Sequence, residues 1–335
     1  MRPSTPTRSV TSTDVARDSG VSRTTVSYVL NDTPGVTISD QTRARVRASA
    51  ERLGYTPSAA ARTLRTGRSD LVLYVLPDWP LGPAVDSLLD HLAGELAERG
   101  LSLLVHHQRG GRPLTDLLRV VTPRAVVGFT AFATADRDAL RRAGVQVLGT
   151  LLDDPGAAGL FTASQRSIGR LQARHLREHG HRVIGYAAAT DPRVAHFVEL
   201  RLEGVRAECA EAGLAAPQVI SVDPSLESAV AAVRGWRSAD PAATAVAAYN
   251  DDVAIAVLAA VRAEGLQAPR DLAVIGVDDG PAAPFTVPPL TTVSQALEVQ
   301  ARHLAGVVVE GLRGGDEEGL PTGDDLIEVV ARDSV

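Results

Sequence analysis

The sequence predicts a small all-α unit containing a helix-turn-helix, followed by a larger α/β unit built on parallel sheets. The stretch TSTDVARDSGVSRTTVSYVLN (11–31) has the apolar spacing of two short helices broken at Gly20. From Leu71 onward, short continuous apolar runs alternate with amphipathic segments, as in sheets that helices cover on both faces. Residues 1–68 carry 11 Arg and 5 acidic residues, a formal charge of +6. The remainder carries 23 Arg and 35 acidic residues, a formal charge of −12.

Composition limits the class of protein. A length of 335 residues allows two or three domains. The single cysteine, Cys209, permits no intrachain disulfide and is typical of a cytosolic protein. Residues 1–10 lack the apolar centre of a secretory signal and are expected to form a disordered arm. No apolar run approaches the ~20 residues that span a bilayer, so we expect no membrane partner.

The helix-turn-helix is the part of the chain whose chemistry is easiest to predict. Ser22 is placed to cap the second helix, and Asp40–Leu53 is expected to form a third helix that ends at Gly54. The residues expected to turn inward are Val15, Ala16, Val21, Val26, Val29 and Leu30, which leaves Arg23, Thr24, Ser27 and Tyr28 outward. In a helix-turn-helix the second helix enters the DNA major groove, and a basic unit suits a phosphate backbone.

The larger unit has eight expected strands and intervening helices. The strands are expected at Leu71–Leu76, Leu101–Val105, Ala125–Phe129, Val145–Leu148, Val183–Ala187, Val219–Val222, Ala245–Tyr249 and Leu272–Val277. Helices are expected near 84–99, 113–121, 135–143, 167–179, 197–212, 226–236, 252–264 and 296–312. Eight such strands fit one large sheet or two lobes. Ligands of such sheets bind outside the carboxyl ends of the strands, which in a two-lobed form is the crevice between the lobes.

Several motifs occur in a specific order and spacing. They are DVA (14–16), GVSRTTVSYVLN (20–31), ERLGYTPSAAARTLRTGR (51–68), GHRVIGY (180–186), RLEGV (201–205), YND (249–251), DLAVIGVDD (271–279), PPLTTV (288–293) and ARDSV (331–335). In these motifs the chain resembles the LacI/GalR family of bacterial transcriptional regulators over about residues 11–335. The order and spacing are far more specific than any single motif.

The resemblance implies a fold and a set of boundaries. The fold is an N-terminal all-α helix-turn-helix headpiece plus an α/β periplasmic-binding-protein-like type I core with two lobes of parallel sheet. The expected segments are the headpiece 11–57, a hinge helix and linker 58–70, and an effector-binding and dimerisation domain 71–335. Lobe 1 would take about 71–164 and 295–322, and lobe 2 about 165–294 and 323–335, with crossovers near 162–166, 293–296 and 320–326. No long C-terminal heptad is present, so a homodimer is expected rather than a tetramer.

The resemblance also implies which residues contact DNA. Arg23, Thr24 and Tyr28 are expected at base edges, where Arg suits the O6 and N7 atoms of guanine. Phosphate contacts are expected from Thr13, Ser22, Thr25 and Ser27. The alternatives are that Ser22 is a helix cap and Arg23 a solvated charge. Many family members carry Arg where this chain has Tyr28, so the preferred base at that position stays open.

In the hinge, Leu64 matches the leucine that family members insert into the minor groove at the operator centre. An apolar wedge of this kind kinks the duplex. The small side chain of Ala61 would let the segment enter the groove. The alternative is that Leu64 packs against the body of the protein.

The effector site is expected around four residues. Arg201 matches the arginine that grips effector hydroxyls or carboxylates, and Asn250 and Asp278 match effector-contacting positions at strand ends. Asp251 could cap the helix that follows it, and Asp279 could fix a turn. The aromatic pair that sugar-binding members often carry after the first strand is absent, although Trp79 could supply a stacking face.

Two further aspartates that are usual in the family are replaced, one within residues 150–152 and one by Gln165. Fewer acceptors for sugar hydroxyls weaken the case for a simple monosaccharide. A modified or larger sugar, a nucleoside, another ligand and no ligand all remain open.

Other chemistries have little support. His175, His179 and His181 are close in sequence, but Gly180 separates the last from the helix of the first two, so we expect no metal site. No phosphate-binding P-loop and no GxSxG nucleophile elbow occur, so we expect neither cofactor nor enzyme activity.

The leading hypothesis is therefore a cytoplasmic, nucleoid-associated repressor. It would bind pseudopalindromic double-stranded DNA as a homodimer under control of a small-molecule effector, with a carbohydrate as the family default. The alternative is a solute-binding protein of a transport or sensing system.

Overall fold

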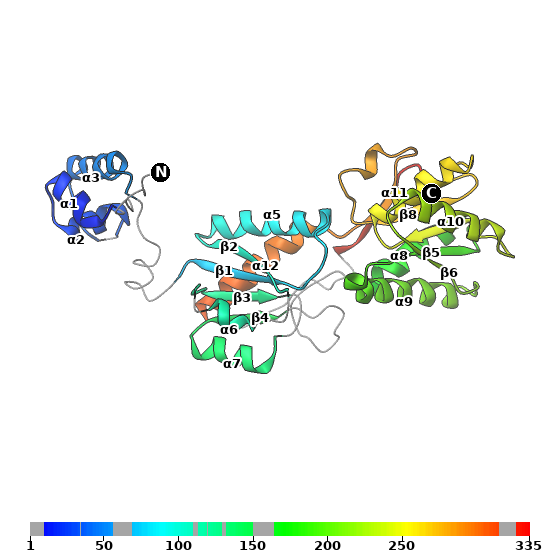
Figure 1. Cartoon of the computed structure of the whole chain (residues 1–335), viewed down its shortest axis with the longest axis horizontal. Coiled ribbons are helices and arrows are strands. Elements are labelled where there is room, and N and C mark those ends of the chain that lie inside the picture. Colours follow the sequence, from blue (N-terminus) through cyan, green and yellow to red (C-terminus); the bar gives the residue numbers. More distant parts are fainter. Residues whose placement is uncertain are drawn as a thin grey trace, which may run out of the picture. The chain divides into compact units, whose positions relative to one another are not determined.

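The computed structural model divides into two compact units, Met1–Ser69 and Asp70–Val335 (Figure 1). The described residues are 10–33, 35–55, 69–109, 113–118, 120–128, 132–149, 164–314 and 326–335. The predicted arm, apart from Val10, and the hinge residues Ala61 and Leu64 lie outside them. So do residues 162–163 of the predicted first crossover and residues 320–325 of the third. Within the described residues, no helix has the length and apolar character needed to cross a membrane.

The described residues of the first unit form three helices around a small core. They are α1 (Ser12–Ser19), α2 (Arg23–Leu30) and α3 (Asp40–Leu53). The backbone N–H of Thr11 donates to the Asp14 carboxylate at 2.9 Å, which fixes the start of α1. Gly20, with φ of 67°, allows the sharp turn into α2. The core is formed by Val15, Ala16, Val26, Val29, Val46 and Ala50, so the predicted inward face is the one the structure buries.

In the second unit, one parallel sheet has the strand order β2-β1-β3-β4. The strands are β1 (Leu71–Leu76), β2 (Ser102–His107), β3 (Ala125–Gly128) and β4 (Gln146–Gly149). Alternate residues of β1 enter opposite cores: Val72 and Tyr74 pack with α5 (Pro83–Glu98) and α12 (Leu297–Arg313). Leu73 packs on the other face, where α6 (Leu114–Leu117) and α7 (Thr134–Arg142) lie.

A second sheet has the strand order β10-β9-β8-β7-β5-β6. Its strands are β5 (Ile184–Ala189), β6 (Gln218–Val222), β7 (Ala245–Ala248), β8 (Ala273–Val277), β9 (Thr291–Ser294) and β10 (Glu328–Val330). One face packs on α8 (Gln165–Glu178) and α9 (Ala195–Glu211), and the other on α10 (Leu226–Ser238) and α11 (Asp251–Ala263). The described part of this unit also contains two short 3-10 helices, η1 (Pro192–Val194) and η2 (Ala283–Phe285).

The structure decides between one sheet and two in favour of two, and it corrects the element prediction in places. β9 and β10 were not predicted, because Thr-rich and Glu-containing short segments give no continuous apolar run. β10 is also antiparallel to β9, unlike the other pairs. The helix predicted over 113–121 is a single turn, Leu114–Leu117. β1 has the bounds predicted for it, and each of the other predicted strands differs at one or both ends by one or two residues.

Candidate functional sites

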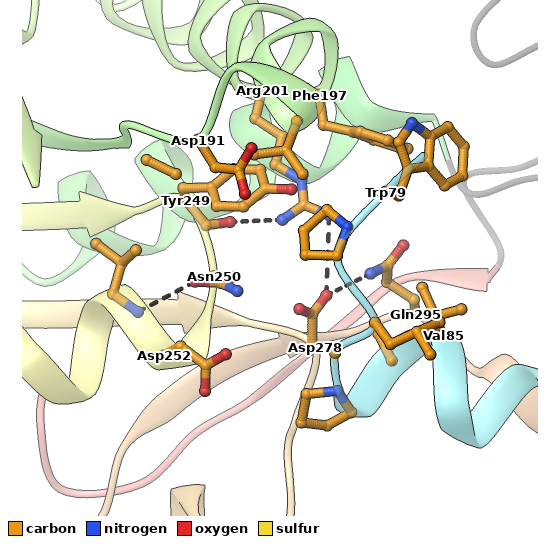
Figure 2. Close-up of a pocket in the computed structure, with 18 of the residues that line it drawn as sticks. Trp79, Val85, Asp191, Phe197, Arg201, Tyr249, Asn250, Asp252, Asp278 and Gln295 are labelled. Atoms are coloured by element: carbon orange, nitrogen blue, oxygen red, sulfur yellow. Dashed lines mark hydrogen bonds and ion pairs between the residues drawn. The ribbon is translucent and has the colours of Figure 1, made fainter. Parts of the chain in front are cut away.

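A cavity of about 300 Å³ lies at the carboxyl ends of strands of both sheets. The segment after β1 lines one side, and residues at the ends of β5, β7 and β8 line the other. All four residues predicted to contact an effector line it: Trp79, Arg201, Asn250 and Asp278 (Figure 2). This placement is the one expected for the ligand crevice of a parallel α/β sheet.

Arg201 on α9 is buried and held from several directions. Its Nε donates to Gln165 Oε1 at 2.8 Å, and its Nη1 donates to the backbone oxygen of Tyr249 at 2.5 Å. The guanidinium carbon lies 4.9 Å from the centre of the Tyr249 ring, in a cation–π arrangement. A guanidinium with this many fixed partners keeps one orientation, so its remaining N–H groups are preorganised for a ligand.

Close backbone packing of α8 against α9 sets the position of Arg201. A Cβ on Gly169 would lie 1.9 Å from the backbone oxygen of Arg201, and a Cβ on Gly204 would lie 2.0 Å from that of Arg166. Only glycine permits this approach, which brings Gln165 beside Arg201. Gln165, predicted to be a lost acceptor, thus holds the arginine.

Asn250 ends the strand β7 and caps α11. Its Oδ1 accepts from the Val253 backbone N–H at 3.0 Å, so its amide nitrogen is left to donate toward the cavity (Figure 2). Buried Gln172 on α8 donates to the backbone oxygens of Ala248 at 2.9 Å and Gly276 at 3.2 Å. Gln172 therefore ties together the strand ends from which Asn250 and Asp278 arise.

Asp278 follows β8 in a strained conformation, with φ of 109°. Its Oδ1 accepts from Gln295 Nε2 at 2.7 Å and lies 3.8 Å from Arg201 Nη2. Burial raises the pKa of this carboxyl to about 6, against the lowering effects of Arg201 and of the Gln295 hydrogen bond.

Asp251 is not the cap that the sequence left open, since Asn250 has that role. Its carboxylate is buried below the turn after β8, where it accepts from the Gly280 N–H at 2.7 Å and the Thr292 hydroxyl at 2.6 Å. Burial raises its pKa to about 7. Asp279 has φ of 47° and pairs with Arg332 at 2.7 Å, in agreement with the turn-fixing alternative.

Trp79 has an aromatic partner that sequence reasoning missed. Its ring and that of Phe197 on α9 meet edge to face, with centroids 4.7 Å apart (Figure 2). Asp191, Tyr249, Asp252 and Gln295 were also missed. Tyr249 and Asp252 flank the motif Asn250-Asp251. They could have been predicted by including the neighbours of each residue at the carboxyl end of a strand. Phe197 and Gln295 carry no local signal.

In the first unit, the described residues predicted to contact DNA lie on α2 and at its N-cap, except for Thr13, which is in the first turn of α1. Thr13, Ser22, Arg23 and Thr24 are exposed, and Thr25, Ser27 and Tyr28 are half-buried. Ser22 Oγ accepts from the Thr25 N–H at 3.0 Å, so Ser22 is an N-cap in this structure. The free end of α2 and its exposed side chains form the surface that a major groove would meet.

The histidine motif forms no site. The rings of His175 and His179 are 4.2 Å apart, but His179 Nδ1 is within 2.8 Å of the His175 backbone oxygen and His181 bonds to Thr244. In the described part of the chain, no group of three His, Cys, Asp or Glu side chains is arranged to hold a metal ion.

Family models match both parts of the chain. The model of bacterial regulatory proteins of the lacI family matches residues 11–58, and a periplasmic binding protein-like domain matches residues 173–335. The chain is 30% identical to the HTH-type transcriptional regulator CelR of Thermobifida fusca, over 91% of this chain and 92% of CelR. It is 32% identical to the ribose operon repressor of Escherichia coli K12, over 84% of this chain and 87% of the repressor.

Solved structures agree. The Lac repressor dimer bound to operator and the anti-inducer ONPF aligns with a TM-score of 0.79 and 24% identity, over 98% of this chain and 99% of that one. A complex of the transcriptional regulator CelR with cellobiose aligns with a TM-score of 0.64 and 27% identity, over 97% and 100%. These matches confirm the predicted fold class. Both relatives are named as regulators of transcription, which agrees with the function predicted from the sequence.

Proposed function

Because the chain belongs to the LacI family of bacterial regulatory proteins, we propose that it is a transcriptional repressor. Its affinity for operator DNA changes when a small molecule binds in the pocket. It acts as a homodimer on a pseudopalindrome with half-sites about one helical turn apart. The observation that carries the proposal is one chain joining a basic helix-turn-helix to a cavity lined by Arg201, Asn250 and Asp278. It acts in the cytoplasm, at the nucleoid.

Roles for individual residues follow from this proposal. Arg23, Thr24 and Tyr28 contact base edges, and Thr13, Ser22, Thr25 and Ser27 position α2 on phosphates. Ala61 and Leu64 enter the minor groove at the operator centre. Arg201, Asn250, Asp278 and Trp79 contact the effector. Since curated relatives include a ribose operon repressor and a regulator solved with cellobiose, a hydroxylated effector is proposed.

The solute-binding alternative is not favoured, because a transport protein has no use for a helix-turn-helix that matches a regulator family. Genome-wide mapping of bound DNA in the native host tests the repressor. We expect a few shared palindromes, increased transcription of adjacent genes on deletion of this gene, and loss of occupancy in Arg23→Ala. Bound fragments without a common sequence, or unchanged transcription on deletion, would contradict the proposal.

A further inference from the structure

The two walls of the cavity differ in chemistry. The wall after β1 is formed by residues 79–85 and Leu88, and its lining side chains are apolar: Trp79, Pro80, Leu81, Pro83, Ala84, Val85 and Leu88. Leu81 is 51% exposed although it is a large apolar side chain. A ligand group that covers this wall therefore gains by removing apolar surface from water.

The opposite wall has the hydrogen-bonding groups. Asn250 has an amide nitrogen to donate, and Asp278 has one oxygen, Oδ2, beyond the Gln295 bond. Asp252, in the first turn of α11, is exposed and bonds to no other described residue. Figure 2 shows Asn250, Asp252 and Asp278 on the same side of the cavity, opposite Trp79. Carboxylates are acceptors only, so this wall suits a ligand that donates hydroxyl hydrogens.

The charge of the lining disfavours negatively charged ligands. Three carboxylates line the cavity, those of Asp191, Asp252 and Asp278, against one lining cation, Arg201, among the described residues. Arg193 pairs with Asp191 at 2.6 Å, and Arg201 is already engaged by Gln165, the Tyr249 backbone and Asp278. The described lining therefore carries more negative than positive charge, and Asp252, which pairs with no described cation, would repel a phosphate or a carboxylate.

We propose that the effector is an uncharged two-faced molecule, a hydroxylated ring that carries an aromatic or alkyl substituent. The ring meets Arg201, Asn250 and Asp278, and the substituent lies on the apolar wall of residues 79–85 and Leu88. This inference rests on the proposed function and narrows it. It sets this pocket apart from one that holds a bare monosaccharide, and it excludes sugar phosphates and sugar acids. A volume of about 300 Å³ lies at the lower end of the range for drug-sized ligands.

Calorimetry on the full-length protein with matched ligand series tests the proposal. Each series contains a free sugar, its p-nitrophenyl glycoside and its 6-phosphate, for glucose, galactose, xylose and ribose, without the phosphate where the ring has no 6-hydroxyl. Adenosine and adenosine monophosphate form a further pair. In at least one series we expect the aryl form to bind at least tenfold more tightly than the free sugar. The phosphorylated form should bind at least tenfold more weakly than its neutral partner.

Two variants assign these preferences to the walls. Leu81→Ser should reduce the aryl preference severalfold, because it weakens binding of the aryl form more than binding of the free sugar. Leu226→Ser is the matched control, since that leucine is 54% exposed and does not line the cavity, and it should change neither affinity. Asp252→Asn should reduce the difference in affinity between the phosphorylated ligand and its neutral partner.

Equal binding of aryl and free sugars, tighter binding of a phosphorylated ligand, or no binding in any series would overturn the inference. The proposed function is judged separately, by sequence-specific operator binding of the same protein. If the protein binds its operator but prefers sugar phosphates, the proposed function is supported and the inference about the ligand is wrong.

Discussion

At the scale of single residues, the same residue type has different roles in different surroundings. Asp251 and Asp278 both follow strand ends, but Asp251 is enclosed by backbone and hydroxyl donors, whereas Asp278 faces the cavity. The sequence motifs could not separate them, because burial depends on the turn after β8. Arg23 and Arg45 are likewise both exposed, yet only Arg23 lies at the free end of α2.

The position of Arg23 predicts a loss of sequence discrimination. Arg23→Ala should cost about 1–3 kcal/mol per half-site on the operator and little on a variant already mutated at the contacted base pair. Arg45→Ala removes the same charge from α3, so it should weaken both DNAs equally. Fluorescence anisotropy with both DNAs at fixed salt measures this. Equal loss for Arg23→Ala on the two DNAs would make Arg23 only a phosphate contact.

The buried carboxyl of Asp251 predicts a pH-dependent stability. Its pKa in the folded state, about 7, lies above the unfolded value of 3.8, so the folded state binds the extra proton between these values. The stabilisation is complete below pH 3.8 and is lost as pH rises through about 7, with a slope of up to about 1.4 kcal/mol per pH unit. Urea unfolding of the wild type and Asp251→Asn between about pH 5.5 and 8.5, on either side of the folded pKa, measures this. The difference between the two should change across that pKa, and parallel curves would contradict it.

At the scale of elements, the pattern of apolar runs predicted the helices and strands of the parallel core well. It failed where an element depends on distant partners. β10 pairs with β9 at Glu328 and Ser294, positions far apart in the sequence, and neither segment shows the pattern alone. In the site, strand-end residues such as Asn250 were predictable. Phe197 and Gln295 reach the cavity only because of how α9 and the β9–α12 connection pack.

The glycines between α8 and α9 give a prediction for these elements. Gly169→Ala must separate the two helices, because its Cβ would overlap the Arg201 backbone, and overpacking of this kind costs about 1–3 kcal/mol. Ligand affinity should fall as well, since Arg201 moves with α9. Gly306→Ala on α12 is the control: no atom lies within 4 Å of its Cβ, so it should stabilise by about 0.5–1 kcal/mol. Thermal unfolding and calorimetry compare them, and a stable Gly169→Ala protein with normal ligand binding would refute the packing argument.

At the scale of the whole molecule, control of operator binding by an effector requires that ligand binding in the pocket and DNA binding by the first unit affect each other. Within the second unit, the bond from Gln295 to Asp278 joins the lining of the cavity to the connection between β9 and α12. Gln300 on α12 donates to the backbone oxygen of Gln295 at 2.5 Å, which extends this network toward the first sheet. A ligand that donates a hydrogen bond to Asp278 thus competes with the Gln295–Asp278 hydrogen bond, which links the second sheet to α12.

The predicted hinge, residues 58–70, gives a second prediction that compares operator DNA with random DNA. Leu64→Ala should weaken operator binding much more than binding to random DNA, because an apolar wedge acts only where it can unstack the central step. Arg62→Ala, which changes a nearby charge in the same segment, should weaken both DNAs similarly. Anisotropy titrations at two salt concentrations separate the two effects. If Leu64→Ala weakened binding to operator and to random DNA equally, Leu64 would not act as a wedge in the minor groove.

The two sites must also be thermodynamically reciprocal. If a ligand from the matched series changes operator affinity by some factor, the operator must change the affinity for that ligand by the same factor, typically about 5–150-fold in coupled proteins. Four dissociation constants of the full-length protein close this cycle: operator with and without saturating ligand, and ligand with and without saturating operator. A scrambled duplex of equal length should leave ligand affinity nearly unchanged, because it does not select the operator-bound conformation. Ligand affinity that is the same with and without operator would mean that the pocket, whatever it binds, does not control the DNA-binding unit.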